Sequence, residues 1–288
     1  MKCSLILATL GRDVELIYFL NSLQNQTYRE FELIVIDQNR DGKIDSVIAS
    51  CKTRFPVNHI KVDFKGNSRA RDYGIRFAQG DIIAFPDDDC VYEKDVLKKV
   101  VEEFRDKPNI AILSAGSYDF SETRFSIGVN SKWPRYFSQF YMMGVEFTHF
   151  FNLKRMDRSE FYLDHEFGIG GKYPGAEGFE LLYRLLRAGN KAFYDPDIKI
   201  YHADKDNYKV GTDRMLLYSA GVGAYIRKFT NEYDLSMLYY IARKMFVAPV
   251  IKMMVAAVLM NRKRFVYSYN NLIGVWRGFC AYGRYGHG

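Results

Sequence analysis

Cysteine is scarce in this chain: four occur among 288 residues, far apart as Cys3, Cys51, Cys90 and Cys280. No two of them form a CxxC pair or a metal-ligand spacing, so the sequence offers neither a disulfide framework nor a cysteine metal site. A reduced, cytosolic chain is therefore expected.

Two common glycine-rich phosphate-binding motifs are also missing. The sequence contains no GxGxxG and no GxxxxGK[ST], which excludes a dinucleotide fingerprint and a P-loop. A phosphate group would have to be bound through a metal ion and through basic side chains such as Arg71.

Long hydrophobic runs are absent as well. The apolar start at residues 1–9 is too short for a signal peptide and lacks a cleavage site, so it is interpreted as a first strand. The run at residues 246–260 is apolar apart from Lys252. It is shorter than the ~20 residues that span a bilayer, so a spanning helix is not expected.

No acidic residue follows Asp234, although the net charge of the chain is +7. Eight basic residues lie in that last segment: Arg243, Lys244, Lys252, Arg262, Lys263, Arg264, Arg277 and Arg284. Because apolar residues lie beside them, an anionic membrane surface is a better expected partner than a nucleic acid. The prediction is an in-plane helix peripheral to the inner face of the cell membrane. The alternative is a core helix with basic ends.

The most informative motif in the sequence is a short acidic turn, Asp87-Asp88-Asp89, which follows the apolar residues 82–85 and Pro86. Adjacent carboxylates repel one another in a partly buried site. A divalent cation, Mg²⁺ or Mn²⁺, bound together with a diphosphate would relieve that repulsion. The alternative is a solvated turn that caps the next helix.

Apolar strands alternate with helical segments along the first 115 residues. Strands are expected at residues 5–9, 31–37, 59–64, 82–85 and 109–114, and helices after Asp13 and at 44–55, 68–78 and 93–105. This order predicts an α/β fold with a mostly parallel sheet between flanking helices. Ligands bind at the carboxyl ends of such strands, so Thr9, Asp37 and the acidic turn should converge on one crevice.

The next segment, residues 118–167, is irregular and rich in aromatic residues, which suit sugar rings but more often form ordinary core. A turn at residues 194–197 is expected to precede a short strand, residues 198–202, that ends in His202. This histidine is either structural or a ligand of the same metal ion.

Together these segments resemble the family 2 glycosyltransferases, which share the GT-A fold. The matching segments are ATLGR (8–12), SLQNQT (22–27), IVID (34–37), SRARDYG (68–74) and GDIIAFPDDD (80–89), with Asp72 where the family usually has Asn. The resemblance extends to about residue 202. It implies an inverting, metal-dependent sugar transferase.

The resemblance also implies roles for individual residues. It assigns nucleotide-sugar binding to Thr9, Arg12, Asp37, Arg71, Asp87 and Asp88. Asp89 coordinates Mg²⁺ or Mn²⁺, and His202 matches a family histidine that can join it. The usual Glu-Asp pair before the helix is Glu177-Gly178 here, so the base is assigned to Glu177, with Glu180 second and Asp164 third. Alternatively, Glu177 and Glu180 cap the helix.

The expected organisation is a GT-A catalytic domain at residues 1–210, with a nucleotide-binding half to about 115 and an acceptor half after it. A helical, basic region follows at 211–288. The expected function is transfer of a sugar, from a UDP-linked donor, to a lipid-linked or glycan acceptor in bacterial surface glycan synthesis. The alternatives are a non-catalytic nucleotide-sugar-binding subunit and a sugar nucleotidyltransferase.

Overall fold

The computed structural model describes residues 1–51, 54–121, 125–126, 128–203 and 212–283. The chain forms two compact units. Unit 1 comprises Met1–Leu163 and Leu181–Asp204, and unit 2 comprises Asp164–Glu180 and Lys205–Gly288.

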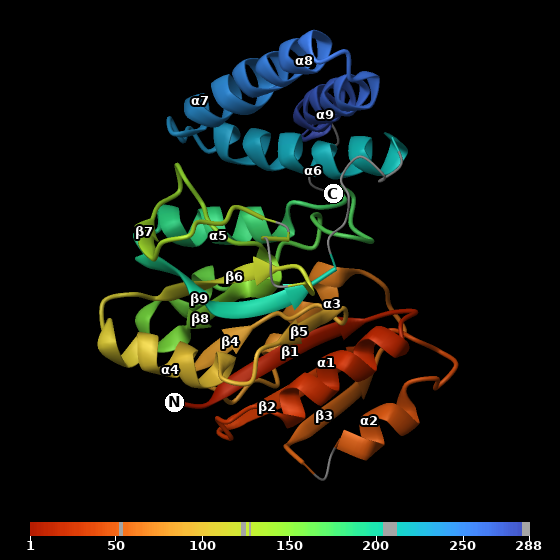
Figure 1. The fold of residues 1–288 in the computed structure, drawn as a ribbon, viewed down its shortest axis with the longest axis vertical. Helices are drawn as coiled ribbons and strands as arrows, with labels where there is room; N and C mark the ends of the chain where they lie inside the picture. Colours follow the sequence, from red (N-terminus) through yellow and green to blue (C-terminus); the bar gives the residue numbers. More distant parts are fainter. Residues whose placement is uncertain (52–53, 122–124, 127, 204–211, 284–288) are drawn as a thin grey trace. The chain divides into compact units, whose positions relative to one another are not determined.

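Unit 1 is built on one mixed sheet of nine strands in the described part of the chain (Figure 1). The order is β3-β2-β1-β4-β8-β6-β9-β5, with β7 also paired to β9. The strands are β1 Cys3–Thr9, β2 Phe31–Asp37, β3 Val57–Lys61, β4 Ile82–Ala84, β5 Cys90–Tyr92, β6 Ile112–Tyr118, β7 Arg135–Phe137, β8 His149–Asn152 and β9 Ala192–His202. Strands β1 to β4 run parallel, so the predicted α/β fold is confirmed for this half.

Helices cover both faces of the parallel half of the sheet. Alternate β1 residues such as Leu5 and Leu7 share one apolar core with α1 (Val14–Gln24), α2 (Asp45–Cys51) and α4 (Val96–Asp106). Helix α3 (Asn67–Ile75) lies on the other face, where a Cβ on Gly74 would come within 2.4 Å of Ile6. Two faces covered by helices explain why β1 and β2 are almost continuously apolar.

The carboxyl ends of β1 and β2 lie side by side because Thr9 is in register with Asp37. Strand β4 pairs with the other edge of β1, and the acidic turn begins three residues after the end of β4 at Ala84. Three strand ends therefore bring polar side chains to one edge of the sheet, as predicted.

Several expected elements differ in extent. Strand β5 follows the acidic turn directly, before α4, and pairs with β9 around Cys90 and His202; this strand was not predicted. The turn predicted at residues 194–197 is wrong, because β9 continues through Pro196 to His202. A shift of the β6–β9 register after Asp195 accommodates the proline. Helices α2, α3 and α4 are shorter than predicted.

The remaining short elements of unit 1 are 3₁₀ turns: η1 Glu146–Thr148, η2 Leu153–Arg155 and η3 Arg158–Glu160. Helix α5 (Glu177–Arg187) begins in unit 2 and continues into unit 1. Its N-terminal turn therefore carries Glu177 and Glu180 in unit 2.

Unit 2 is helical. It contains α6 (Thr212–Asn231), α7 (Met237–Tyr240), the π-helical η4 (Ile241–Val247), α8 (Ala248–Val258) and α9 (Arg262–Ala281). The elements α7, η4 and α8 follow one another without a gap as one helical run over residues 237–258, with Pro249 in the first turn of α8. Helices α6 and α9 pack through glycines, since a Cβ on Gly278 would lie 1.8 Å from the Ala220 carbonyl oxygen.

A membrane-spanning segment is not found among these helices. Within the described residues, none is both long enough and apolar enough to cross a bilayer.

Candidate functional site

The acidic turn is held against the end of β1. Thr9 Oγ1 donates a hydrogen bond of 2.8 Å to Asp88 Oδ2. Burial raises the pKa of Asp88, and the nearby Arg12 guanidinium and the Thr9 hydroxyl act against that shift. Burial has the larger effect, so the pKa of Asp88 lies above its usual range although Arg12 and Thr9 favour the ionised form.

Arg12, in the loop after β1, bridges the second and third carboxylates of the turn. Its NH1 nitrogen forms ion pairs with Asp88 Oδ1 and, at 2.9 Å, with Asp89 Oδ2. Burial alone would lower the pKa of Arg12, but the charges of Asp88 and Asp89 raise it. One cationic side chain therefore neutralises part of the acidic turn.

Arg71, on α3, meets the first carboxylate from the other side. Its NH2 nitrogen lies 2.6 Å from Asp87 Oδ1, and its NH1 nitrogen lies 2.7 Å from Glu146 Oε1. Arg71 is 1% exposed. The predicted nucleotide-binding arginine is thus buried between two carboxylates, and Glu146 was not recognised from the sequence.

Asp89 faces His202 at the end of β9. The Nε2 nitrogen of His202 lies 3.3 Å from Asp89 Oδ1, and its Nδ1 nitrogen lies 2.7 Å from the Ala203 carbonyl oxygen. Because a carbonyl oxygen only accepts, Nδ1 carries the proton and Nε2 of a neutral ring presents a lone pair to Asp89. Phe147 stacks on the ring at a centroid distance of 4.9 Å and fixes its plane.

These side chains fit a divalent cation. One potential ligand atom from each of Asp87, Asp89 and His202 lies within 4.8 Å of the others. Carboxylate oxygens and an imidazole nitrogen suit Mn²⁺, and carboxylates alone suit Mg²⁺. The hydrogen bond from His202 to Ala203 is the kind of support that orients a metal-binding histidine.

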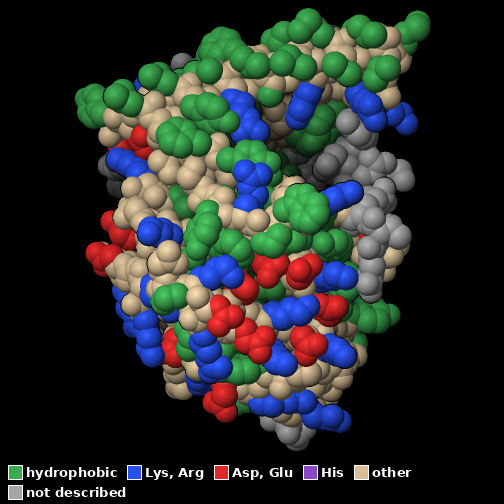
Figure 2. Space-filling view, turned by 60° about the vertical axis from the view of Figure 1, so that its left-hand side comes forward, with side chains coloured by type: hydrophobic (Ala, Val, Ile, Leu, Met, Phe, Trp, Pro, Cys, Tyr) green, Lys and Arg blue, Asp and Glu red, His purple; other side chains and the backbone are tan. Residues whose placement is uncertain are grey.

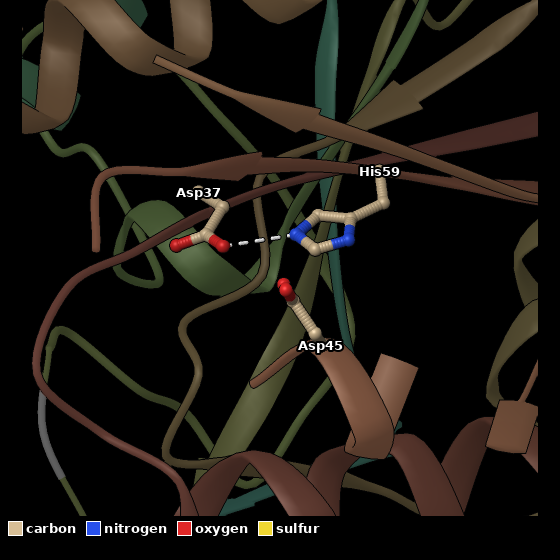
Figure 3. A group of neighbouring side chains, drawn as sticks. All are labelled: Asp37, Asp45 and His59. Carbon is tan, nitrogen blue, oxygen red and sulfur yellow. Dashed lines mark hydrogen bonds and ion pairs between the residues drawn. The ribbon is translucent and has the colours of Figure 1, made fainter. Parts of the chain in front are cut away.

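A second group of possible ligands, Asp37, Asp45 and His59, surrounds the end of β2 (Figure 3). Asp37 is fully buried and lies 2.9 Å from His59 Nε2, while its Oδ1 accepts hydrogen bonds from the backbone and side-chain nitrogens of Asn39, both 2.8 Å long. Asp45 is half exposed and pairs with Lys61 at 2.5 Å. A contact within the protein thus accounts for the closeness of Asp37 and His59, while Asp45 pairs with a different residue, Lys61.

The three candidate bases lie in unit 2. Lys228 on α6 lies 2.8 Å from Asp164 Oδ2 and 2.7 Å from Glu180 Oε1. Burial alone would lower the pKa of Lys228, but the charges of Glu180 and Asp164 outweigh it and raise the pKa. Glu180 is 1% exposed, whereas Glu177 at the start of α5 is half-buried. Of these two, Glu177 is the more accessible to an acceptor hydroxyl.

The structure thus brings the predicted donor and metal residues of unit 1 together at one edge of the sheet, and it places the predicted bases in unit 2. Sequence reasoning missed four residues that contact them: Asn39, His59, Glu146 and Lys228. Asn39 follows the β2 carboxylate by two residues, a spacing typical of a loop hydrogen bond. The other three lie far from their partners in sequence, so no local signal marks them.

The sequence profile "Glycosyl transferase family 2" matches residues 4–159, which is more than half of the chain. An uncharacterized glycosyltransferase of Haemophilus influenzae is 32% identical over 108 residues, or 37% of this chain and 36% of that protein. The uncharacterized Bacillus subtilis glycosyltransferase YfnE is 29% identical over 114 residues, or 39% of this chain and 29% of that protein. The matches thus span about a third of the length of these two curated relatives.

Solved structures share the fold at low sequence identity. Staphylococcus aureus TarS 1–349 in complex with UDP-GlcNAc has a TM-score of 0.62 at 14% identity, covering 100% of this chain and 93% of that one. The Pyrobaculum calidifontis mannosyltransferase PcManGT, in complex with GDP-Man and Mn²⁺, has a TM-score of 0.69 at 13% identity, covering 96% and 86%. These likenesses show the predicted GT-A fold. The profile match over residues 4–159 shows that the chain belongs to glycosyl transferase family 2.

Proposed function

We propose that the chain is an inverting, metal-dependent glycosyltransferase that uses a nucleotide sugar, UDP-linked, as donor. Its acceptor is a lipid-linked or polysaccharide glycan of a bacterial surface. The observation that carries the proposal is the Asp89–His202 pair, with Asp87 beside it, at the carboxyl ends of the sheet strands.

Different residues of unit 1 bind different parts of the donor. Asp87, Asp89 and His202 would hold Mg²⁺ or Mn²⁺, which neutralises negative charge on the departing diphosphate. Thr9 and Asp37 lie beside one another and bind the nucleoside. Arg71 holds Asp87 in place through an ion pair. Glu177 takes the proton from the acceptor hydroxyl, which then attacks the anomeric carbon and inverts it.

The related structures support this choice of donor and ion. TarS was solved with UDP-GlcNAc, and PcManGT was solved with GDP-Man and Mn²⁺. Both ligands are nucleoside diphosphate sugars, and the cation in the second is of the kind that Asp87, Asp89 and His202 would hold.

Donor binding can be tested by thermal unfolding with UDP-, dTDP- and GDP-sugars, each with and without Mn²⁺. We expect a UDP-sugar to raise the melting temperature only when Mn²⁺ is present, because a ligand that binds the folded state alone stabilises it. No shift with any nucleotide sugar would contradict the proposal.

The products that the protein releases distinguish a glycosyltransferase from the two alternative functions, a binding subunit and a sugar nucleotidyltransferase. A glycosyltransferase releases UDP from the UDP-sugar, by transfer or by slow hydrolysis, whereas a binding subunit shows the thermal shift without release. A sugar nucleotidyltransferase would instead form the nucleotide sugar from a nucleoside triphosphate and a sugar phosphate, releasing pyrophosphate.

We further propose that unit 2 docks on an anionic membrane surface through helix α8. This helix buries Pro249 and Ala256 but exposes most of its other apolar side chains: Val250, Ile251, Met254, Val255 and Val258. Figure 2 shows hydrophobic side chains gathered along this part of unit 2, with Lys and Arg side chains beside them. An apolar helix face next to basic residues suits the interface of an anionic bilayer.

Replacing Ile251, Val255 and Val258 together by Ser is expected to weaken vesicle binding at least about tenfold, because each loses apolar area that would enter the lipid. The measurement is flotation of the full chain with phosphatidylglycerol-containing vesicles. The matched control replaces the exposed α1 residues Val14, Ile17 and Tyr18 by Ser. Equal lipid-bound fractions for the two triple variants would refute the docking proposal.

A further inference from the structure

Arg12 occupies the carboxylates that a catalytic cation would use. Its NH1 nitrogen contacts both Asp88 Oδ1 and Asp89 Oδ2, and the Asp89 contact is 2.9 Å long. The other oxygen of Asp89, Oδ1, faces His202. A cation that used both oxygens of Asp89 would therefore have to share Oδ2 with the guanidinium or replace it there.

Electrostatics makes this sharing unfavourable. The side chains of Asp88 and Asp89 are only 9% and 12% exposed, so water screens charges near them weakly. A guanidinium and a divalent cation on the same carboxylate repel each other across a few ångströms. The arginine and the ion are therefore competitors for Asp89, and binding of one favours departure of the other.

Arg12 is the arginine of this site that can change partners. Its side chain is 37% exposed, whereas the Arg71 side chain is 1% exposed and is fixed between Asp87 and Glu146. Arg12 also follows Gly11, which has a φ of 83° and no atom within 4 Å of the place where a Cβ would lie. Because more than a third of the Arg12 side chain is exposed, it borders solvent into which it can rotate.

The backbone of this loop is anchored by contacts that do not involve the side chain of Arg12. The Gly11 N–H donates to Asn39 Oδ1 at 2.7 Å, and Lys43 Nζ donates to the Gly11 carbonyl oxygen at 2.9 Å. A side-chain rotation of Arg12 therefore needs no rearrangement of β1 or β2. The diphosphate of a donor would offer the displaced guanidinium a new anionic partner with matching geometry.

We propose that Arg12 is an exchangeable counter-ion: it bridges Asp88 and Asp89 in the donor-free protein and transfers to the diphosphate when donor and cation bind. This inference rests on the proposed function. Its consequence is thermodynamic coupling. The divalent cation binds weakly to the free protein and more tightly with the nucleoside diphosphate, since only then is Arg12 drawn away from Asp89.

The test is Mn²⁺ affinity, measured by electron paramagnetic resonance of free Mn²⁺ with and without UDP. For the unaltered chain we expect UDP to tighten Mn²⁺ binding by about 5–150-fold, the usual range of coupling between two sites. For Arg12→Gln we expect tighter Mn²⁺ binding than in the unaltered chain without UDP, by about tenfold, and a smaller gain from UDP.

Two variants control for simpler causes. Arg40→Gln removes an equal charge from the exposed loop after β2, where Arg40 contacts the Asp63 carbonyl oxygen, and it should leave Mn²⁺ affinity nearly unchanged. Arg12→Lys keeps the charge and should retain most of the weak binding seen without UDP. Circular dichroism checks that each variant is folded.

Three results would overturn the inference. One is equal Mn²⁺ affinity of Arg12→Gln and the unaltered chain without UDP. Another is the same tightening in Arg40→Gln, which would mean that net charge alone is responsible. The third is no Mn²⁺ binding by the unaltered chain even with UDP, which would overturn the metal-dependent function as well; the first two would leave that function intact.

Discussion

Glu177→Gln is expected to lower sugar transfer by about 10²–10⁴-fold, the usual contribution of a general base, while changing the donor Kd by less than about twofold. The amide has the size of the carboxylate but cannot take a proton from the acceptor hydroxyl. Glu177 is half-buried at the start of α5, in the helical turn where the family resemblance places the base. The measurement pairs the rate of UDP release with calorimetry of UDP-sugar binding.

Two control variants make the Glu177→Gln result specific. Glu166→Gln removes a half-buried carboxylate of unit 2 that pairs loosely with Lys172, at 3.6 Å, and should leave the rate unchanged. Glu180→Gln should instead lower the melting temperature, because it removes a partner of the buried Lys228. Equal losses of transfer and donor binding in Glu177→Gln would move the base to another residue.

Asp89→Asn is expected to weaken Mn²⁺-dependent donor binding at least about tenfold, the smallest cost usually seen even for residues that only support a metal ligand. The amide keeps an oxygen but loses the negative charge that attracts the ion. His202 would then face a neutral group 3.3 Å away. The measurement is calorimetry of UDP-sugar binding with and without Mn²⁺.

Measuring donor binding without Mn²⁺ shows whether Asp89→Asn weakens donor binding through loss of the ion. In the absence of Mn²⁺, Asp89→Asn and the unaltered chain should bind the donor equally weakly. Asp106→Asn, an exposed position at the end of α4, should behave like the unaltered chain under both conditions. An unchanged Kd for Asp89→Asn with Mn²⁺ present would remove Asp89 from the metal site.

Strand ends were predictable from the sequence because local patterns specify them. The apolar runs of β1 and β2 end at Thr9 and Asp37, as expected, and a parallel sheet requires those ends to share an edge. Strand β9 was not predicted in full, since Pro196 between two aspartates is typical of a turn. Pairing with β6 overrides that preference where the register shifts.

The contacts between side chains of the site were less predictable from the sequence than the place of the site in the fold. The acidic turn was found because it follows a strand, and His202 because it ends one. Nothing near Arg71 in sequence points to Glu146, 75 positions later. Likewise, the position of Arg12 in the loop after β1 does not show that it bridges Asp88 and Asp89. Such contacts depend on tertiary packing, which brings together residues that local sequence patterns treat separately.

We propose that Asp89 and His202 hold a divalent cation together with the diphosphate of a nucleotide sugar. The direct measurement is anomalous diffraction at the manganese edge from crystals grown with UDP and Mn²⁺. We expect one strong peak within coordination distance of Asp89 and His202, with the UDP phosphates beside it and the Arg12 guanidinium turned toward them. A peak only at Asp37, Asp45 and His59, or no peak with the acidic turn pointing away from the nucleotide, would contradict it.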